Sequence, residues 1–384
     1  MPRARTQPAP STPSVPAGYD GPRACGPFEL AGVLDLANLV LRTLNTPAEA
    51  SPRHPTVGGD YPHIYNAANL DNIRVVARNG RVVSSVAIFP MKVRTPRGVI
   101  SVGGINAFVT HPDHRRQGLG EAVLRDAHAR MRANGHHIGW LSTRIHDYYR
   151  KFGWESAGRQ RSFVFDRGNI DRLPASRDLT VDEEWRADVA QLNALHDGEP
   201  LVVPRGVDRF TLLAQRKFAR LFVARRAGAV VAYAGTSGTA VREFGGPADD
   251  VAALVRAVFT RLDDPTVHTS ERPPGQRATI EMTVIAPPTG TGLPGLLERL
   301  GIPHHNDYGG MLLALDAPGL FEALRIRTVA LRRRGDGWRL THGAHTLDVS
   351  ARGLVKLLFG PERTPGFAPN VFPVPFYLWP ADRV

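Results

Sequence analysis

The sequence contains almost no cysteine and no long apolar run. Cys25 is the only cysteine among 384 residues, so no disulfide within the chain and no cysteine-rich metal cluster can form. No apolar run is long enough to span a bilayer. The first 19 residues are rich in proline, alanine and serine and lack the apolar segment of a secretory signal. We therefore expect a disordered tail at 1–19, a cytoplasmic location, no membrane partner and no metal site.

Lysine is also scarce. The net charge is +12, from 48 lysines and arginines against 36 aspartates and glutamates, and a positive balance can favour nucleic acid. The arginines are scattered along the chain, however, and no basic stripe with interleaved aromatic residues occurs. We therefore attribute the arginine excess to a GC-rich coding sequence and expect no nucleic-acid partner. The only lysines are Lys92, Lys151, Lys217 and Lys356.

The most informative stretch lies between Val99 and Met131. An apolar run at 99–109 is followed by RRQGLG at 115–120 and then by apolar residues at helical spacing, which places the glycines on a strand-to-helix turn. The free N–H groups and the positive dipole end of a helix start bind anions. Glycine lets a phosphate approach the backbone, and arginine adds charge and forked donors. The stretch therefore predicts a pyrophosphate-binding loop.

The pattern arginine–x–x–glycine–x–glycine between a strand and a helix resembles motif A of the GNAT acetyltransferases, which holds the pyrophosphate of coenzyme A. It lacks the glycine–lysine–serine/threonine of a Walker loop and the third glycine of a dinucleotide-binding loop. The elements around it also follow the order of a GNAT domain, which we expect at 20–172. They are a helix at 32–44, a loop at 45–70, strands at 73–77 and 82–89 joined by Asn79-Gly80, strands at 91–93 and 99–109, the loop and its helix, a strand at 138–142, a short helix at 147–152 and a strand at 162–165.

The next section, 173–309, is similar in its order. A helix at 182–195, a hairpin at 221–224 and 230–234, a glycine turn at 245–247, a helix at 249–262 and a strand at 279–285 are expected. Asp249 and Asp250 would oppose an anion at the first turn of that helix, so we expect a degenerate, structural copy. From 310 onward the pattern changes: a strand at 311–315, a helix at 318–324, a hairpin at 328–341, a helix at 351–359 and an aromatic, proline-rich end at 372–384.

The whole layout resembles the enhanced intracellular survival (Eis) acetyltransferases. A second motif, tyrosine–x–x–Phe-Gly-aromatic at 149–154, carries this resemblance. It implies a mixed α/β and α+β fold, with tandem GNAT-like domains, the first catalytic and the second degenerate, followed by a sterol-carrier-protein-like α+β domain at 310–384. It also implies acetyl-CoA as co-substrate and a homo-oligomer, which is a hexamer in that family.

The resemblance implies a set of site residues. Tyr149 would be the general acid, since a phenol stays protonated at neutral pH and can donate to the departing thiolate. Tyr148 competes for this role, and only one of two adjacent helical residues can face the thioester. A backbone N–H at Val109 or Thr110 would polarise the carbonyl. The cofactor-binding residues would be Phe108, Val109, Thr110, Arg115, Arg116, Gln117, Gly118, Leu119, Gly120, Glu121, Arg144 and Ile145.

The base is less clear. In the family it is the C-terminal carboxylate of an aromatic last residue, whereas this chain ends in Val384. We expect Val384 to serve, with Asp382 or water as alternatives. The tail aromatics would either anchor the tail between the first and third domains or complete the core of the third. The tail aromatics are Phe376, Tyr377 and Trp379, and the other titratable residues near the site in sequence are His111, His114, His146 and Asp147, which we expect to be turn or surface residues.

The expected function is acetyl-CoA-dependent transfer of an acetyl group to a primary amine, either of an aminoglycoside-like amino sugar or of a peptide lysine. A cationic acceptor needs nearby carboxylates. The alternatives are a non-catalytic acyl-CoA sensor and a lipid or ligand carrier that uses the C-terminal domain. Candidate carboxylates for the acceptor are Asp60, Asp71, Glu155 and Glu199.

Overall fold

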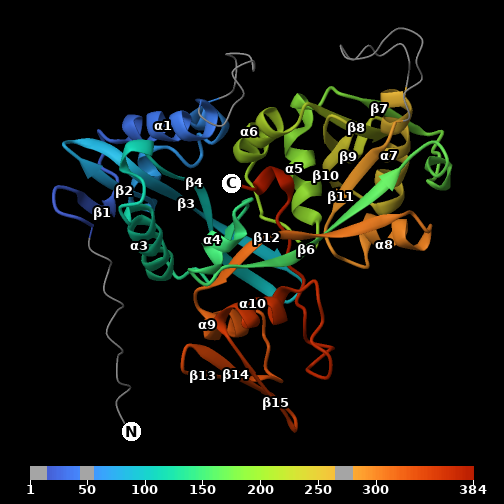
Figure 1. Cartoon of the computed structure of the whole chain (residues 1–384). Coiled ribbons are helices and arrows are strands. Elements are labelled where there is room, and N and C mark those ends of the chain that lie inside the picture. The colour runs from blue at the N-terminus through green and yellow to red at the C-terminus, as the bar shows by residue number, and fades with distance from the viewer. Residues whose placement is uncertain (1–14, 44–55, 264–279) are drawn as a thin grey trace. The chain divides into compact units, whose positions relative to one another are not determined.

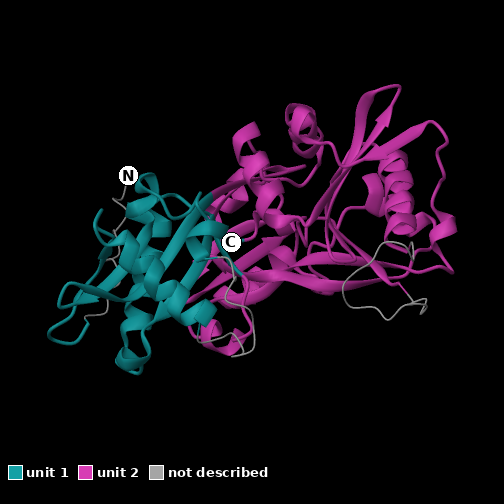
Figure 2. Cartoon of the chain, turned by 90° about the horizontal axis from the view of Figure 1, so that it is seen from above, with its two compact units in different colours: residues 1–90, 103–141, 384 teal, residues 91–102, 142–383 magenta. Residues whose placement is uncertain are grey.

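The computed structural model describes residues 15–43, 56–263 and 280–384. Contacts divide the chain into two compact units, coloured separately in Figure 2. Unit 1 comprises 1–90, 103–141 and 384, and unit 2 comprises 91–102 and 142–383. The expected domain boundaries at 172 and 309 do not coincide with these units and stay a prediction. No helix in the described part of the chain is long and apolar enough to cross a membrane.

Unit 1 contains five sheet strands in the order β1-β2-β3-β4-β5. Strands β1 to β4 are labelled in Figure 1. Strands β2 and β3 form an antiparallel hairpin through Asn79 and Gly80, whose φ angles of 49° and 74° fit the expected Asn-Gly turn. Unit 1 includes β3 up to residue 90 and β4 from residue 103. The elements are β1 (Asp20–Ala24), α1 (Leu30–Asn38) with a continuing turn (Leu39–Thr43), α2 (Val57–Asp60), β2 (Ile73–Arg78), β3 (Arg81–Thr95), β4 (Gly98–Thr110), α3 (Leu119–Ala133) and β5 (Ile138–Leu141).

Helices α1 and α3 cover opposite faces of this sheet. On β2, Ile73 and Val75 belong to a buried cluster with Val33 of α1, whereas the intervening Arg74 forms an ion pair with Asp126 of α3. Because successive side chains of a strand point to opposite faces, the two helices lie on different sides. The expected apolar stripe of α3 is buried in full, and it comprises Leu119, Val123, Ala127 and Met131.

The N-terminal segment differs from expectation. Residues 1–14 lie outside the described residues, but Tyr19 is not part of a disordered tail. It directly precedes β1, which pairs antiparallel with β2. The region expected to be a loop at 45–70 is described only from 56, where it contains α2 and a helical turn at Ala67–Asn72.

Unit 2 contains sheet strands in the order β12-β6-β11-β10-β9-β8-β7, and a three-stranded sheet in the order β13-β14-β15. Helix α10 packs against strands of both sheets, β6 and β12 in one and β14 and β15 in the other. The elements are α4 (His146–Arg150), β6 (Glu155–Phe165), β7 (Leu179–Asp182), α5 (Val189–Gly198), α6 (Val207–Lys217), β8 (Arg220–Arg226), β9 (Ala229–Ser237), β10 (Ala240–Gly245), α7 (Ala248–Asp263), β11 (Met282–Ala286), α8 (Gly292–Arg299), β12 (His304–Ala314), α9 (Ala317–Ala323), β13 (Ala330–Arg334), β14 (Gly337–His342), β15 (His345–Val349) and α10 (Ala351–Phe359).

Strand β6 is much longer than the expected strand at 162–165. It begins at Glu155 and pairs antiparallel with both β11 and β12. The first part of the strand was not predicted, because the polar run Arg159-Gln160-Arg161 lacks the apolar pattern of a buried strand. Its partner β12 likewise runs across the expected domain boundary at 310. The helix expected at 182–195 is shorter, because β7 ends at Asp182 and α5 begins only at Val189.

The expected hairpin at 221–234 is confirmed as β8 and β9, which turn at Ala227 and Gly228. Strands β10 and β11 are parallel, and α7 lies between them in the chain. A close approach of α5 to β10 depends on Gly245. A Cβ there would lie 2.5 Å from the ring of Tyr233 and 3.1 Å from the carbonyl carbon of Leu195, so the helix would have to move away.

Candidate active site

The end of β4 is distorted and is held by β3. Ala107 has a φ of 42° although it lies within the strand, a conformation typical of a β-bulge, which re-aims the backbone that follows. The Ser84 hydroxyl donates to the carbonyl of Val109 at 3.1 Å, and the N–H of His111 donates to the carbonyl of Val83 at 2.8 Å. These contacts fix the segment that contains Phe108, Val109 and Thr110.

The RRQGLG segment forms an exposed turn that ends at α3. Arg116 and Gly118 have left-handed φ angles of 61° and 78°. Gly118 is the residue before the helix, no side chain caps the helix start there, and a Cβ at this position would meet nothing within 4 Å. The first N–H groups of α3 thus form the uncapped, positive helix end that binds anions. Exposed residues of the turn are Arg115, Arg116, Gln117 and Gly118, while Leu119 is buried, Gly120 is half-buried and Glu121 pairs with Arg125 at 2.8 Å.

Tyr19 holds this turn from the N-terminal side. Its hydroxyl donates to the amide oxygen of Gln117 at 2.7 Å and lies 2.8 Å from Nδ1 of His114. Arg78 donates to the same hydroxyl at 3.3 Å. A single tyrosine therefore contacts the turn at Gln117 and the residue before it, His114. Sequence reasoning missed this residue, because it lies in a proline-rich stretch without any periodic pattern.

Tyr149 lies on α4 in unit 2. Its side chain is buried, and its ring packs edge-on against Trp154 with centroids 6.2 Å apart. Tyr148 is half-buried and packs against Phe152 at 5.3 Å. Burial raises the pKa of the Tyr149 phenol above its ordinary value, so the hydroxyl carries its proton throughout the neutral range. Unit 2 also contains the expected cofactor residues Arg144 and Ile145, both exposed and just before α4.

The positions of Tyr377 and Trp379 agree with neither of the two expectations for the tail aromatics. Tyr377 and Trp379 belong to the main core cluster of unit 2, together with Phe163 of β6 and Phe244 of β10. The indole N–H of Trp379 donates to the carbonyl of Leu201 at 2.9 Å. These two rings therefore complete the core of the section expected to be a degenerate copy, and not that of the third domain. Phe376, in contrast, packs against Phe359 of α10 in the third section, with ring centroids 5.4 Å apart.

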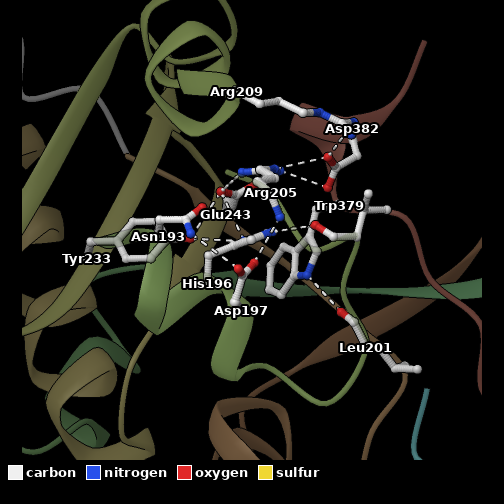
Figure 3. Close-up of polar contacts among 11 residues, drawn as sticks. Asn193, His196, Asp197, Leu201, Arg205, Arg209, Tyr233, Glu243, Trp379 and Asp382 are labelled. Atoms are coloured by element: carbon white, nitrogen blue, oxygen red, sulfur yellow. Dashed lines mark hydrogen bonds and ion pairs between the residues drawn. The ribbon is translucent and has the colours of Figure 1, made fainter. Parts of the chain in front are cut away.

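Asp382 is part of a buried cluster of charges (Figure 3). Arg205 donates to both oxygens of Asp382, at 3.0 and 2.8 Å, and to both oxygens of Glu243, each at 2.8 Å. All three side chains have no exposed surface. Burial alone would raise the pKa of Asp382, but the Arg205 guanidinium outweighs it and holds the pKa below its usual range. Such a carboxylate is a poor proton acceptor, which argues against Asp382 as the base.

Two further groups contact this cluster. Arg209, which is partly exposed, donates to Asp382 at 3.3 Å, so two arginines face two carboxylates. Burial lowers the pKa of His196, which keeps its ring uncharged, and Nε2 lies 3.2 Å from the carbonyl of Val203. Since a carbonyl only accepts, the neutral ring carries its proton on Nε2. Nothing in the sequence marks these residues, because they come from separate elements without a motif.

Val384 itself belongs to unit 1. It is half-buried and packs against the cluster that contains Ile64, Tyr65 and Ile73. Within the same unit, the Tyr65 hydroxyl donates to the buried side chain of Asn106 on β4 at 2.7 Å. The last residue is therefore next to the core of the unit that carries the RRQGLG turn.

The other titratable candidates have local partners. The His111 ring accepts from the N–H of Asp113 at 3.3 Å, and His114 contacts Tyr19. His146 lies 2.9 Å from the carbonyl of Thr143, and Asp147 pairs with Arg150 at 2.8 Å. These contacts fit the expectation of turn and surface residues.

The four carboxylates considered for an acceptor do not lie in one unit. Asp60 and Asp71 are in unit 1, where they pair with Arg42 and Arg130, and Glu155 and Glu199 are in unit 2. Glu155 is buried and pairs with Arg150 at 2.9 Å. Burial raises the pKa of Glu199 to about 7, so this carboxyl is only partly charged at neutral pH. Three of the four carboxylates, those of Asp60, Asp71 and Glu155, are thus paired with an arginine.

These features define a class. Residues 24–157 match the family model of the acetyltransferase (GNAT) domain, so the chain contains a GNAT domain, and the enzyme class that this domain defines is N-acetyltransferase. The matched range includes the bulged strand end, the RRQGLG turn and α4. No curated protein matches the sequence.

Solved structures extend the likeness to most of the chain. One is a GCN5-related N-acetyltransferase from Kribbella flavida, with 18% identity, a TM-score of 0.56 and coverage of 85% of this chain and 86% of that one. Another is Eis1 from Mycobacterium abscessus, with 13% identity, a TM-score of 0.57 and coverage of 94% and 97%. A GCN5-related N-acetyltransferase from Anabaena variabilis has 14% identity, a TM-score of 0.57 and coverage of 88% and 89%. At these identities the likeness establishes the fold alone.

Proposed function

We propose that this protein transfers an acetyl group from acetyl-CoA to a primary amine, borne by an amino sugar or by a peptide lysine. The observation that carries the proposal is the uncapped start of α3 behind Gly118, beside two exposed arginines. Backbone N–H groups at a helix start and forked guanidinium donors are the groups that recognise a pyrophosphate.

The cofactor residues follow from this placement. Residues 115–121 would hold the pyrophosphate, and Phe108, Val109 and Thr110 would hold the pantetheine and the acetyl group by their backbone. The left-handed φ of 42° at Ala107 supports this assignment, because such a break in the regular strand geometry re-aims the backbone groups that follow it. Arg144 and Ile145 are proposed to line the cofactor as well.

The chemistry needs an acid and a base. The amine nitrogen attacks the thioester carbon, a C–N bond forms and the C–S bond breaks. Tyr149 would give its proton to the departing thiolate, and the carboxylate of Val384 would take the proton that the amine loses. The position of Val384, half-buried against the core cluster of unit 1, supports the second role, and the burial of Tyr149, which keeps its phenol protonated, supports the first.

We propose that 173–309 is a second, degenerate GNAT-like section. The order β8-β9-β10-α7-β11 repeats the order β2-β3-β4-α3-β5. The first turn of α7 carries Asp250, which is 7% exposed and pairs with Arg226 at 2.7 Å, so a carboxylate takes the place that a phosphate would need. The sterol-carrier-like assignment of 310–384, the homo-oligomer and the cytoplasmic location remain predictions.

An amine panel tests the activity. We expect the protein to release free coenzyme A thiol from acetyl-CoA when an aminoglycoside, a polyamine or a lysine peptide is added, measured with a thiol reagent. The same amines already acetylated at nitrogen serve as the control and should give no release above the hydrolysis background. Tight acetyl-CoA binding without release by any amine would instead favour the acyl-CoA sensor. Failure to bind acetyl-CoA would favour the carrier.

A one-residue extension tests the base. Appending a glycine after Val384 moves the carboxylate by about 3.5 Å, so kcat should fall by about tenfold or more while the affinity for acetyl-CoA and the melting temperature stay unchanged. Amidation of the unextended C-terminus removes the charge without adding length and should have the same effect. An unchanged kcat in both proteins would leave water as the proton acceptor.

A further inference from the structure

A pocket in unit 2 is not used by the proposed reaction. Its volume is about 320 Å³, near the lower end for small-molecule sites. Residues from β6, the turn before α8, α10 and the tail line it. The walls are mainly apolar, and the lining residues are Pro96, Arg159, Pro200, Pro288, Thr289, Gly290, Thr291, Phe359, Pro373, Val374, Pro375 and Phe376.

The walls are stiff and poor in hydrogen-bond donors. Five of the lining residues are prolines, which have fixed φ angles and no N–H. Phe359 and Phe376 meet edge-on with centroids 5.4 Å apart and give the pocket an aromatic wall. A wall of this kind keeps its shape when empty, so little conformational freedom is lost on binding.

Arg159 supplies the charge. Its side chain is half-buried, and among the described residues no hydrogen bond or ion pair is found for it. Burial lowers the pKa of its guanidinium, the neighbouring Arg161 and Arg363 lower it further, and the negative charge of Glu298 offsets only part of this shift. Arg161, by contrast, pairs with Glu298 at 2.9 Å.

The remaining polar groups fit an anion too. No aspartate or glutamate lines the pocket. The Thr289 hydroxyl donates to the carbonyl of Thr291 at 3.2 Å, so the Thr291 hydroxyl is the other side-chain donor there. A Cβ at Gly290 would meet nothing within 4 Å, so this side of the pocket is open. An unpaired cation in an apolar, preformed cavity is costly unless an anion shares it.

We propose that this pocket binds a small amphipathic anion, with an acidic group on Arg159 and an apolar body against Phe359 and Phe376. None of the residues that line this pocket is among the proposed acetyl-transfer residues, and the proposal does not depend on them.

Two fluorescent probes of matched shape test the proposal. One is 8-anilinonaphthalene-1-sulfonate, and the other is N-phenyl-1-naphthylamine, which has the same rings without the sulfonate. Titrations of the full chain with excess coenzyme A present keep the probes away from the RRQGLG turn. We expect the sulfonate to bind at a single saturable site at least about tenfold more tightly than the neutral probe, the scale of one charge-assisted hydrogen bond.

Three variants locate the site. Arg159→Met should weaken sulfonate binding about tenfold and leave the neutral probe unaffected, and Arg159→Lys should restore part of the affinity. Gly290→Leu fills the open side without changing charge and should weaken both probes. Arg332→Met on β13 is the matched control and should change neither. Equal binding of the two probes, or sulfonate binding that survives both Arg159→Met and Gly290→Leu, would overturn the proposal.

Discussion

Replacing Tyr149 with phenylalanine is expected to lower kcat by about a hundredfold or more, with little change in the affinity for acetyl-CoA. The substitution removes one hydroxyl and keeps the ring that packs against Trp154, so the core around α4 stays intact. The loss would arise because the thiolate of coenzyme A must then leave without a proton. Steady-state kinetics together with calorimetric titration of acetyl-CoA separate the two effects.

Tyr148→Phe is the matched control, because it removes the same group one residue earlier on the same helix. We expect it to change kcat much less. A larger loss for Tyr148→Phe than for Tyr149→Phe would transfer the acid role to Tyr148. The pH profile gives a second check: burial raises the pKa of the Tyr149 phenol above its ordinary value near 10, so proton loss from it should not reduce kcat between pH 7 and 9.

Introducing a carboxylate into the turn is expected to abolish coenzyme A binding. In Gly118→Asp the new charge would lie beside the pyrophosphate, and repulsion between two charges about 4 Å apart near a protein surface is sufficient to weaken binding more than about a hundredfold. Gly120→Asp should act in the same direction. Calorimetry with coenzyme A measures the loss.

Gly118→Asn isolates the charge from the backbone effect. Gly118 has a φ of 78°, a conformation that asparagine and aspartate tolerate better than most residues and to a similar degree. A Cβ at this position meets no other atom, so neither substitution clashes. We expect the asparagine variant to retain most of the affinity. Equal weakening by both residues would mean that the turn binds through its shape alone, and equal affinity in all three proteins would refute the pyrophosphate site.

The sequence predicted the Asn79-Gly80 hairpin, the RRQGLG turn and helix α3 well, because the signals for all three are local. The φ angles of Asn79-Gly80 and Gly118 are backbone requirements that only a few residue types meet, and the buried stripe of α3 follows from helical spacing. The bulge at Ala107 has no such signal, since alanine is not a residue that favours a left-handed φ. It is imposed by the surrounding sheet.

The segments whose structure the sequence did not predict are those whose packing partners lie far away in the chain. Strand β6 contains Arg159, Gln160 and Arg161 yet is largely buried, because β11 and β12 pair with it on either side. Tyr19 gains its role only from Gln117 and His114. Trp379 and Tyr377 pack into a core that starts with Phe163, so no pattern within the tail indicates their position. In the sequence alone, nothing distinguishes Asp382 from an ordinary surface carboxylate. Its buried ion pair with Arg205 becomes evident only in the structure.

The same core has a consequence for how the chain folds during synthesis. Most of unit 1 comes from residues up to 141, and a ribosome can release it early as a unit that folds first. The main cluster of unit 2 begins with Phe163 and also includes Trp379, so this core stays incomplete, with apolar surface exposed, until Trp379 has been synthesised. Pairing over such long sequence separations is slow and prone to aggregation. Production of this protein should therefore depend on chaperones and growth temperature far more through its second half than through its first.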